Sequence, residues 1–231
     1  KESIWLALDL MHRDELIDAE FFQVDKHTIQ GRRISSAWAQ EQHFYFYITF
    51  SEAIKQISYI NEGKRAAVFF KNDPSELEIR VSMSAVDEAG ARMNFEEELS
   101  ELSFEQVRSL GMGKWEQQLG RIEIEGSESM RTNFYTALYH SSIVPNLFTD
   151  VDGRYRGTDL EIHKTEDHNQ YTIFSLWDTY RTAHPLYTLI NADENEDFIK
   201  SMLTHYKDGG KLPVWELSAN YTGCMIGYHT V

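Results

Sequence analysis

The chain of 231 residues has only one cysteine, Cys224, so no disulfide can form within it. It also has no run of 18 apolar residues that could span a bilayer. The first ten residues lack the apolar core and cleavage site of a signal peptide. With 42% hydrophobic residues, the sequence is nevertheless rich enough to bury a substantial core.

Positive charge is scarce, because 22 Lys and Arg residues stand against 37 Asp and Glu residues, giving a formal charge of −15. Nucleic acid and anionic membranes would be repelled by this charge, so we expect neither as a partner. Neutral ligands or cations fit better. The aromatic content of 13% is common in proteins that stack on carbohydrate, although large cores also use such residues.

Both ends of the sequence are typical of a piece of a longer protein. The chain opens without Met and almost directly in an extended-looking run, and its last seven residues form an apolar pattern without a stop signal. We therefore expect an internal fragment.

Residues 1–102 carry mainly strand signals, which are clearest at residues 43–50 and 64–70, where aromatic and β-branched residues are dense. Turn residues separate such runs at positions 30–31, 61–63 and 88–90. Short strands at this spacing predict part of an antiparallel β-sandwich.

Residues 103–126 read as a helical linker. Ser103 and Gln106 have the spacing of a capping box, and the polar stretch that follows predicts a helix to Leu119 with a break at Gly111 and Gly113. Strands first and helices afterwards favour two domains in series, the second starting at residue 127 and remaining incomplete at residue 231.

The helices expected in residues 127–231 follow from apolar periodicity and caps. One covers residues 129–143 and buries Met130, Phe134 and Leu138. Another starts in a capping-box pattern at Ser175 and continues until Pro185 interrupts it. A third is capped by Asp193 and ends at residues 209–210, and its core side contains Phe198, Met202, Leu203 and Tyr206. A last helix begins near Asn220.

Two tryptophan–carboxylate pairs, Trp177–Asp178 and Trp215–Glu216, are the strongest functional signal. An indole offers a flat apolar wall for a sugar ring, and a carboxylate can touch its oxygens or exchange protons. Such a pair is what a sugar-binding pocket requires, and two of them suggest a single site.

Glu216 follows Pro213 in a connection between helices, where extended backbone would present it at the rim of the helical array. The neighbouring indole of Trp215 could then dehydrate the carboxyl group and raise its pKa, as a general acid requires. The alternative is an exposed glutamate before a helix N-terminus.

Asp178 stands three residues before Arg181, so an ion pair could hold its carboxylate ionised and aimed at sugar hydroxyls. A plain helix-capping carboxylate is the alternative, and both roles can hold at once. Among the histidines, only His229 keeps functional interest, because it follows Gly227 in the same part of the chain.

Metal signals are weak. Asp150, Asp152, Gly153 and Asp159 imitate a calcium loop, but Phe148 occupies its first ligand position, so an EF-hand is rejected. Phosphate loops and the Gly-x-Ser-x-Gly motif of serine hydrolases do not occur, so nucleotide chemistry and serine hydrolysis are unsupported.

Four sequence blocks together resemble glycoside hydrolase family 92, whose members are calcium-dependent exo-acting α-mannosidases, often described as α-1,2-mannosidases. The blocks cover residues 133–140, 175–186, 212–217 and 225–229, and residues 30–32, 38–40 and 45–48 are similar to strands of the family's first domain. The resemblance implies an N-terminal β-sandwich followed by an (α/α)6 barrel, of which this chain would hold the first helices.

Carried over by motif, the resemblance implies that Glu216 is the general acid and that Trp177 and Asp178 hold the terminal mannose, with Arg181 and Trp215 beside them. It also implies inversion at the anomeric carbon, mannose-terminated glycans as substrates, and a secreted, periplasmic or cell-surface location. Calcium is expected in the full-length enzyme and not in this chain.

The block that carries the family's general base and most of its calcium ligands does not occur before Val231, so we expect the chain alone to be inactive. The main alternatives are another (α/α)-barrel enzyme, such as a glycoside phosphorylase or a glucoamylase-like hydrolase, and a non-catalytic sugar-binding module. Neither the mannosidic linkage nor the oligomeric state is indicated by the sequence.

Overall fold

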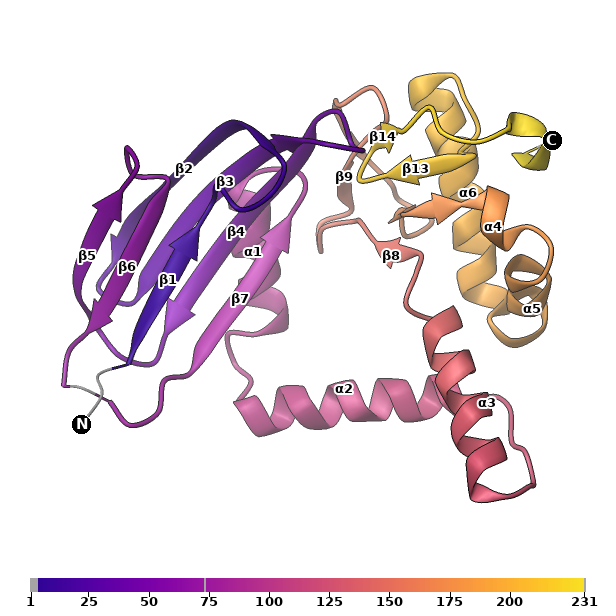
Figure 1. The fold of residues 1–231 in the computed structure, drawn as a ribbon, viewed down its shortest axis with the longest axis horizontal. Coiled ribbons are helices and arrows are strands. Elements are labelled where there is room, and N and C mark those ends of the chain that lie inside the picture. Colours follow the sequence, from indigo (N-terminus) through magenta and orange to yellow (C-terminus); the bar gives the residue numbers. More distant parts are fainter. Residues whose placement is uncertain (1–3, 73, 231) are drawn as a thin grey trace. The chain divides into compact units, whose positions relative to one another are not determined.

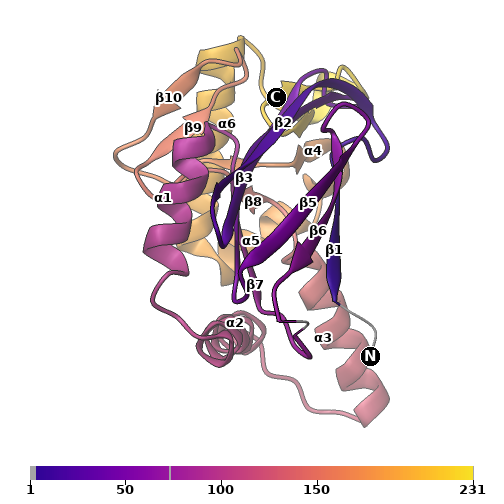
Figure 2. The same cartoon turned by 90° about the vertical axis from the view of Figure 1, so that its left-hand side faces the viewer.

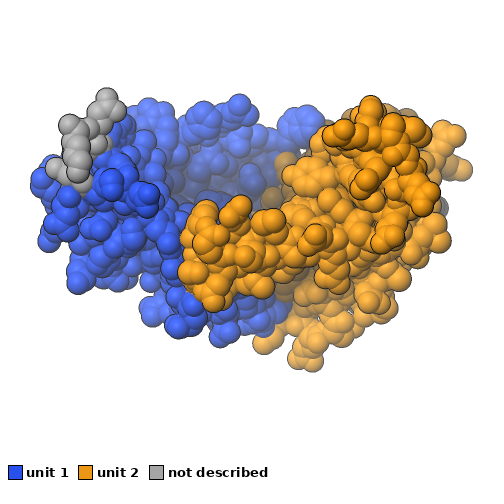
Figure 3. Space-filling view, turned by 90° about the horizontal axis from the view of Figure 1, so that it is seen from below, with its two compact units in different colours: residues 1–101, 150–155 blue, residues 102–149, 156–231 orange. Residues whose placement is uncertain are grey.

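The computed structural model describes residues 4–72 and 74–230, and for residues 229 and 230 the backbone only (Figure 1). The chain divides into two units (Figure 3). Unit 1 contains Lys1–Glu101 and Asp150–Tyr155, and unit 2 contains Leu102–Thr149 and Arg156–Val231. A β-rich first part followed by helices is the order that the sequence predicts.

Unit 1 is built from two antiparallel sheets. The four-stranded sheet has the order β2 (Glu15–Asp25), β3 (Thr28–Ser36), β4 (Gln42–Phe50) and β7 (Ile79–Ser84). The three-stranded sheet has the order β1 (Trp5–Asp9), β6 (Arg65–Phe70) and β5 (Ile54–Ile60). One apolar cluster draws side chains from both sheets, so the predicted β-sandwich is confirmed.

Strand β4 is buried on both faces, which explains its density of aromatic residues. Successive side chains of a strand point to opposite faces. Phe46 and Ile48 join the cluster between the sheets, whereas Tyr45 and Tyr47 pack on helix α1 (Glu88–Glu98) around Ala91. Figure 2 shows α1 alongside the four-stranded sheet.

Two predicted turns of unit 1 are wrong, and the one at residues 61–63 is confirmed. Gly31 lies inside β3 opposite Phe21, and the glycine is needed because a Cβ there would collide with the backbone of the neighbouring strand. Glu88 and Gly90 begin α1, capped by Asp87, whose carboxylate accepts a hydrogen bond of 2.6 Å from the Gly90 amide.

Asp150 ties the segment Asp150–Tyr155 to the rest of unit 1. Its buried carboxylate accepts hydrogen bonds from the Ser84 hydroxyl at 2.7 Å and the Asn94 amide at 2.8 Å. Burial raises the pKa of the Asp150 carboxyl group above its usual range. Residues 150–153 form a turn, in which the Gly153 amide donates a hydrogen bond to the Asp150 carbonyl.

Unit 2 begins with helix α2 (Phe104–Leu119), which carries the capping box predicted at Ser103 and Gln106. The helix continues through Gly111 and Gly113, so the predicted break is wrong. Each glycine costs about 1 kcal/mol relative to alanine in a helix interior, which does not suffice to end a well-capped helix of four turns. A Cβ at either position would meet no atom within 4 Å.

The remaining elements of unit 2 are short strands and helices. The helices are α3 (Glu128–Ser141), α4 (Leu176–Thr179), α5 (Ala183–Ile190), α6 (Ala192–Gly209) and a 3-10 turn (Gly227–Thr230). The strands are β8 (Asn146–Leu147), β9 (Arg154–Arg156, reaching into unit 1), β10 (Ile162–Lys164), β11 (Tyr171–Thr172), β12 (Phe174–Ser175), β13 (Trp215–Leu217) and β14 (Asn220–Tyr221). Phe174, Tyr187 and Phe198 form its buried cluster.

Several predictions for these helices need correction. Met130 is exposed although Leu138 on the same face is buried, and Leu203 and Tyr206 of α6 are also exposed. The cap of α6 is Asn191 rather than Asp193, whereas its predicted end is confirmed by Gly210, which has a left-handed conformation.

Two further differences concern helix boundaries. The helix expected from Ser175 to Pro185 is divided, and Pro185 lies in the first turn of α5, where its missing N–H costs nothing. Asn220 starts a strand and not a helix. Across residues 4–72 and 74–230, none of the helices has the length and apolar character required to cross a bilayer.

Gly90 and Gly111 offer a matched pair of substitutions. A Cβ at Gly90 would collide with the Asp150 carboxylate, so Gly90→Ala is expected to lower the free energy of unfolding by about 1–3 kcal/mol. Gly111→Ala meets open space and should raise it by about 0.5–1 kcal/mol. Urea denaturation measures both; a stabilising Gly90→Ala substitution would contradict the contact.

The Asp150 site predicts a pH dependence. Because the pKa of Asp150 is higher in the folded chain than in the unfolded chain, its stabilising contribution is complete below the unfolded value of about 3.9 and is lost as the pH rises through the folded value. Asp150→Asn cannot ionise. The unfolding free energy of the natural chain relative to this variant should therefore be higher at pH 4 than at pH 7, and a constant or opposite difference would contradict the assignment.

Candidate functional site

The predicted site residues of unit 2 lie on or beside a small three-stranded sheet, β12–β13–β14. Phe174 pairs with Glu216, and Ser175 pairs with Trp215. Leu217 pairs with Asn220 across a two-residue loop, Ser218–Ala219. The extended backbone predicted after Pro213 is therefore present, as strand β13.

The Glu216 side chain points into the interior of unit 2, and only 1% of the residue is exposed. Its Oε1 accepts hydrogen bonds from the Thr172 hydroxyl and the Ala219 amide, both at 2.7 Å, and its Oε2 accepts one from the Ile173 amide at 2.8 Å. The carboxyl group is thus removed from solvent, and the alternative of an exposed glutamate before a helix is wrong. Three donors satisfy a buried carboxylate, which without them would be very costly.

Three residues around Glu216 have left-handed backbone: Ile173 with φ 67°, Ser218 with φ 48° and Ala219 with φ 65°. Such conformations cost about 1–3 kcal/mol each in residues other than glycine, and for β-branched Ile173 they are true outliers. Ser218 and Ala219 form the type of two-residue hairpin turn that usually contains Asn-Gly. Two of the three residues donate their N–H groups to Glu216.

Thr172 links the two strained turns. Its hydroxyl donates to Glu216 and accepts a hydrogen bond of 2.9 Å from the Ser218 amide. The Thr172 side chain is buried and lies at the end of β11, directly before Ile173. A single hydroxyl therefore connects the β11–β12 junction with the β13–β14 hairpin.

His205 lies on the other side of the carboxylate. Its Nε2 is 3.9 Å from Glu216 Oε2 and 3.3 Å from the Tyr171 carbonyl, and only 3% of the residue is exposed. His205 is thus a buried histidine whose ring nitrogen lies close to polar partners. A cavity of about 30 Å³, lined by His205, Lys211, Glu216 and Tyr221 among others, adjoins this group, and it has room for one or two water molecules.

Trp215 neighbours Glu216 in β13, but adjacent strand residues project to opposite faces. The Glu216 carboxylate is shielded from solvent because its side chain packs against Thr172, Ile173 and Ala219. The Trp215 indole, which the sequence suggested for this role, projects to the opposite face of the strand. Trp215 is only partly buried.

Trp177 and Asp178 lie in the single turn α4, and both are exposed. Ser175 is the first cap residue of α4, but its hydroxyl donates to the Asp178 carboxylate and does not accept from the backbone as a capping box requires. The Trp177 amide donates to the Val214 carbonyl at 3.4 Å, which ties this turn to the residue before β13.

Arg181 is exposed in the connection from α4 to α5. Among the residues that the structure describes, no ion pair joins it to Asp178, so that predicted pair is wrong. His229 belongs to the 3-10 turn near α4, but its side chain lies outside the described part of the structure.

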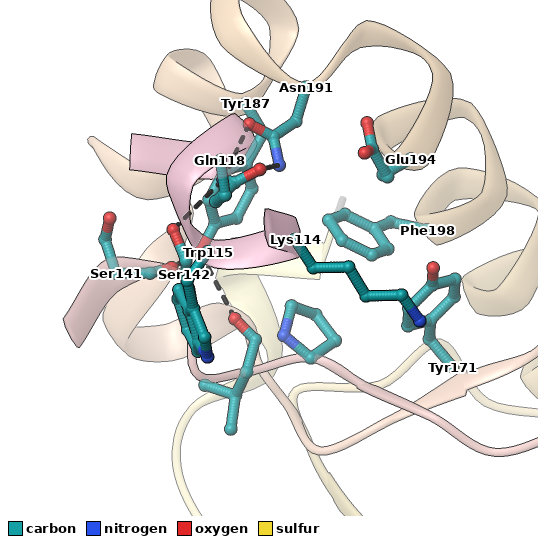
Figure 4. Close-up of a pocket in the computed structure, with 12 residues that line it drawn as sticks. Lys114, Trp115, Gln118, Ser141, Ser142, Tyr171, Tyr187, Asn191, Glu194 and Phe198 are labelled. Carbon is teal, nitrogen blue, oxygen red and sulfur yellow. Dashed lines mark hydrogen bonds between the residues drawn. The ribbon is translucent and has the colours of Figure 1, made fainter. Parts of the chain in front are cut away.

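A second cavity of about 250 Å³ lies among α2, α3, α5 and α6 of unit 2 (Figure 4). Trp115, Tyr171 and Phe198 are among its lining residues. Gln118 donates to Asn191 at 3.2 Å and to Ser142 at 3.1 Å, so these polar groups pair with one another. Together with the ion pair of Arg121 and Glu194 at 2.8 Å, they fasten α2 to the rest of unit 2. None of the predicted site residues lines this cavity.

Thr172, Ile173 and Ala219 are the site residues that sequence reasoning did not find. Ile173 and Ala219 give no chemical signal in the sequence, because they act through backbone N–H groups that a left-handed conformation directs toward a carboxylate. Thr172 acts through its hydroxyl, but its distance of 44 positions from Glu216 in sequence gave no sign of the contact.

The same side chains do not form a cluster of metal ligands in the described part of the chain. In the part of the chain that the structure describes, no three His, Cys, Asp or Glu side chains converge as a metal ion would require. The donors around Glu216 are N–H and O–H groups, which suit a carboxylate and not a cation.

Comparison with known proteins gives a consistent result. The sequence profile of the glycosyl hydrolase family 92 catalytic domain matches residues 90–231. The family GH92 α-mannosidase BT3965 of Bacteroides thetaiotaomicron is 33% identical with a TM-score of 0.87, over 94% of this chain and 32% of its own. Its structure has also been determined with mannoimidazole.

The family GH92 inverting mannosidase BT2199 of Bacteroides thetaiotaomicron VPI-5482 is 26% identical with a TM-score of 0.86, over 100% of this chain and 33% of its own. The chain thus spans about a third of the length of both relatives. No functionally curated protein matches the sequence.

Proposed function

Because the chain belongs to glycosyl hydrolase family 92, we propose that the complete enzyme, of which it would form about a third, is an exo-acting α-mannosidase that inverts the anomeric carbon. The observation that carries this proposal is the fold match to BT3965 at 33% identity. Mannose-terminated glycans are the proposed substrates, with α-1,2-linked mannose first among them.

In this proposal Trp177 and Asp178 form part of the wall that holds the terminal mannose. Both are exposed on one turn, so the indole can stack on a sugar face while the carboxylate, already accepting from Ser175, accepts from sugar hydroxyls. Arg181, Trp215 and His229 are proposed neighbours of the same sugar.

Glu216 is proposed as the general acid, on the condition that the buried carboxyl group becomes accessible to the substrate. Oε1 accepts two hydrogen bonds and Oε2 accepts one, so Oε2 is the atom with room for a proton. A glycosidic oxygen would have to approach it through the 30 Å³ cavity, which must widen first.

Calcium is proposed as a cofactor of the complete enzyme, where it would help bind and orient the sugar. The described residues supply no ligand cluster for it, so every step assigned to this chain uses its own side chains. A secreted, periplasmic or cell-surface location is proposed for the complete enzyme on family resemblance alone.

The activity proposal has a direct test. The complete enzyme should hydrolyse α-1,2-mannobiose and release β-mannose as the first product, detected by proton NMR, and a chelator should abolish turnover. The chain of 231 residues should show no hydrolysis. Turnover by the chain alone would refute its incompleteness, and a requirement for phosphate in the complete enzyme would favour the phosphorylase alternative.

The role of Glu216 is tested with Glu216→Gln in the complete enzyme. A general acid contributes about 10²–10⁴-fold to the rate, so turnover of mannobiose should fall by that factor, while a mannoside with a dinitrophenyl leaving group should be affected far less. Glu196→Gln, on an exposed face of α6, is the matched control and should retain full activity. Unchanged activity of Glu216→Gln would instead favour a role in sugar binding alone.

A further inference from the structure

We infer that the Glu216 carboxylate, together with Thr172, is a positioning group that holds the Trp177–Asp178 turn in place by fixing two strained turns of the backbone. The inference rests on the proposed function only in assigning sugar contact to Trp177 and Asp178. It assigns to Glu216 a task that is separate from proton donation and that exists before any substrate binds.

Two backbone N–H groups from distant parts of the chain point at the Glu216 carboxylate. Ile173 and Ala219 lie 46 positions apart in sequence, yet their N–H groups meet at the two oxygens of one carboxylate, at 2.8 and 2.7 Å. Both residues have left-handed backbone, with φ 67° and 65°. Isoleucine and alanine rarely adopt this conformation unless the surroundings compensate for its cost, and the buried carboxylate provides that compensation.

The second step is the connection to the exposed turn. Ile173 is followed directly by β12 (Phe174–Ser175) and then by α4, which contains Trp177 and Asp178. Phe174 pairs with Glu216 itself, and the Trp177 amide donates to the Val214 carbonyl. One end of this path pairs with the strand that carries Glu216, and the other is attached to Val214, the residue directly before that strand, so a change at Ile173 is expected to shift Trp177.

The third step is the bridge formed by Thr172. Because its hydroxyl donates to Glu216 and accepts from the Ser218 amide, removal of that hydroxyl loosens both strained turns and leaves the carboxylate in place. Thr172 is buried, and its hydroxyl is engaged by Glu216 and Ser218. Substitution at Thr172 thus perturbs the network while keeping the proposed proton donor, Glu216, in the chain.

The first experiment uses the chain itself and needs no activity. Glu216→Gln places an amide N–H₂ opposite N–H donors and should lower the melting temperature by about 5 °C or more. In an Ile173→Gly background, where glycine adopts the left-handed conformation freely, the same substitution should lower it by about half as much. Leu160, which also has left-handed backbone with φ 66° but makes no hydrogen bond to Glu216, provides the control: a Leu160→Gly background should leave the full loss.

The second experiment uses the complete enzyme. Thr172→Val should raise KM for a mannoside several-fold with a smaller change in kcat, because a displaced sugar wall weakens binding in ground state and transition state alike. Thr172→Ser keeps the hydroxyl and should restore the natural KM.

Equal losses in melting temperature in the natural and Ile173→Gly backgrounds would overturn the inference. An unchanged KM in Thr172→Val would do the same for the link to Trp177. If the complete enzyme hydrolyses no mannoside, the proposed function fails, while the melting experiment still decides whether Glu216 fixes the strained turns.

Discussion

The hydrogen bonds between the Glu216 carboxylate and the amides of Ile173 and Ala219 are the constraint on which the β12–β13–β14 region depends. A carboxylate that is 99% removed from solvent is stable only when donors surround it, and left-handed residues are stable only when their groups are held. Here the left-handed residues donate to the buried carboxylate, and the carboxylate holds their N–H groups, so each stabilises the other. The result is a small sheet whose register places Trp177 and Asp178 on an exposed turn next to a buried acid.

Unit 1 uses a buried carboxylate in a comparable way. Asp150 accepts from Ser84 and Asn94, and so binds a segment from late in the chain to β7 and α1. In both units the acid joins backbone pieces that are distant in sequence, because a carboxylate can accept several hydrogen bonds at once. Burial of such a group raises the pKa of Asp150, which makes the stability of unit 1 sensitive to pH.

The sequence predicts the architecture better than the site. Dense aromatic and β-branched residues identify β4, short strands separated by turn residues identify the sandwich, Ser103 and Gln106 identify the start of α2, and Gly210 identifies the end of α6. The errors at Gly31, Gly111 and Asn220 share one cause, because tertiary contacts or a strong cap override the local preference of each residue.

The Glu216 environment was beyond sequence reasoning for a different reason, because two of its three donors are main-chain N–H groups, of Ile173 and Ala219, which every residue type except proline possesses. Amide hydrogen exchange of these two residues tests the account most directly. Their exchange should be as slow as that of the interior amides of α6, and Glu216→Gln should accelerate it while leaving α2 unchanged. Rapid exchange in the natural chain, or no change in the variant, would contradict the central claim.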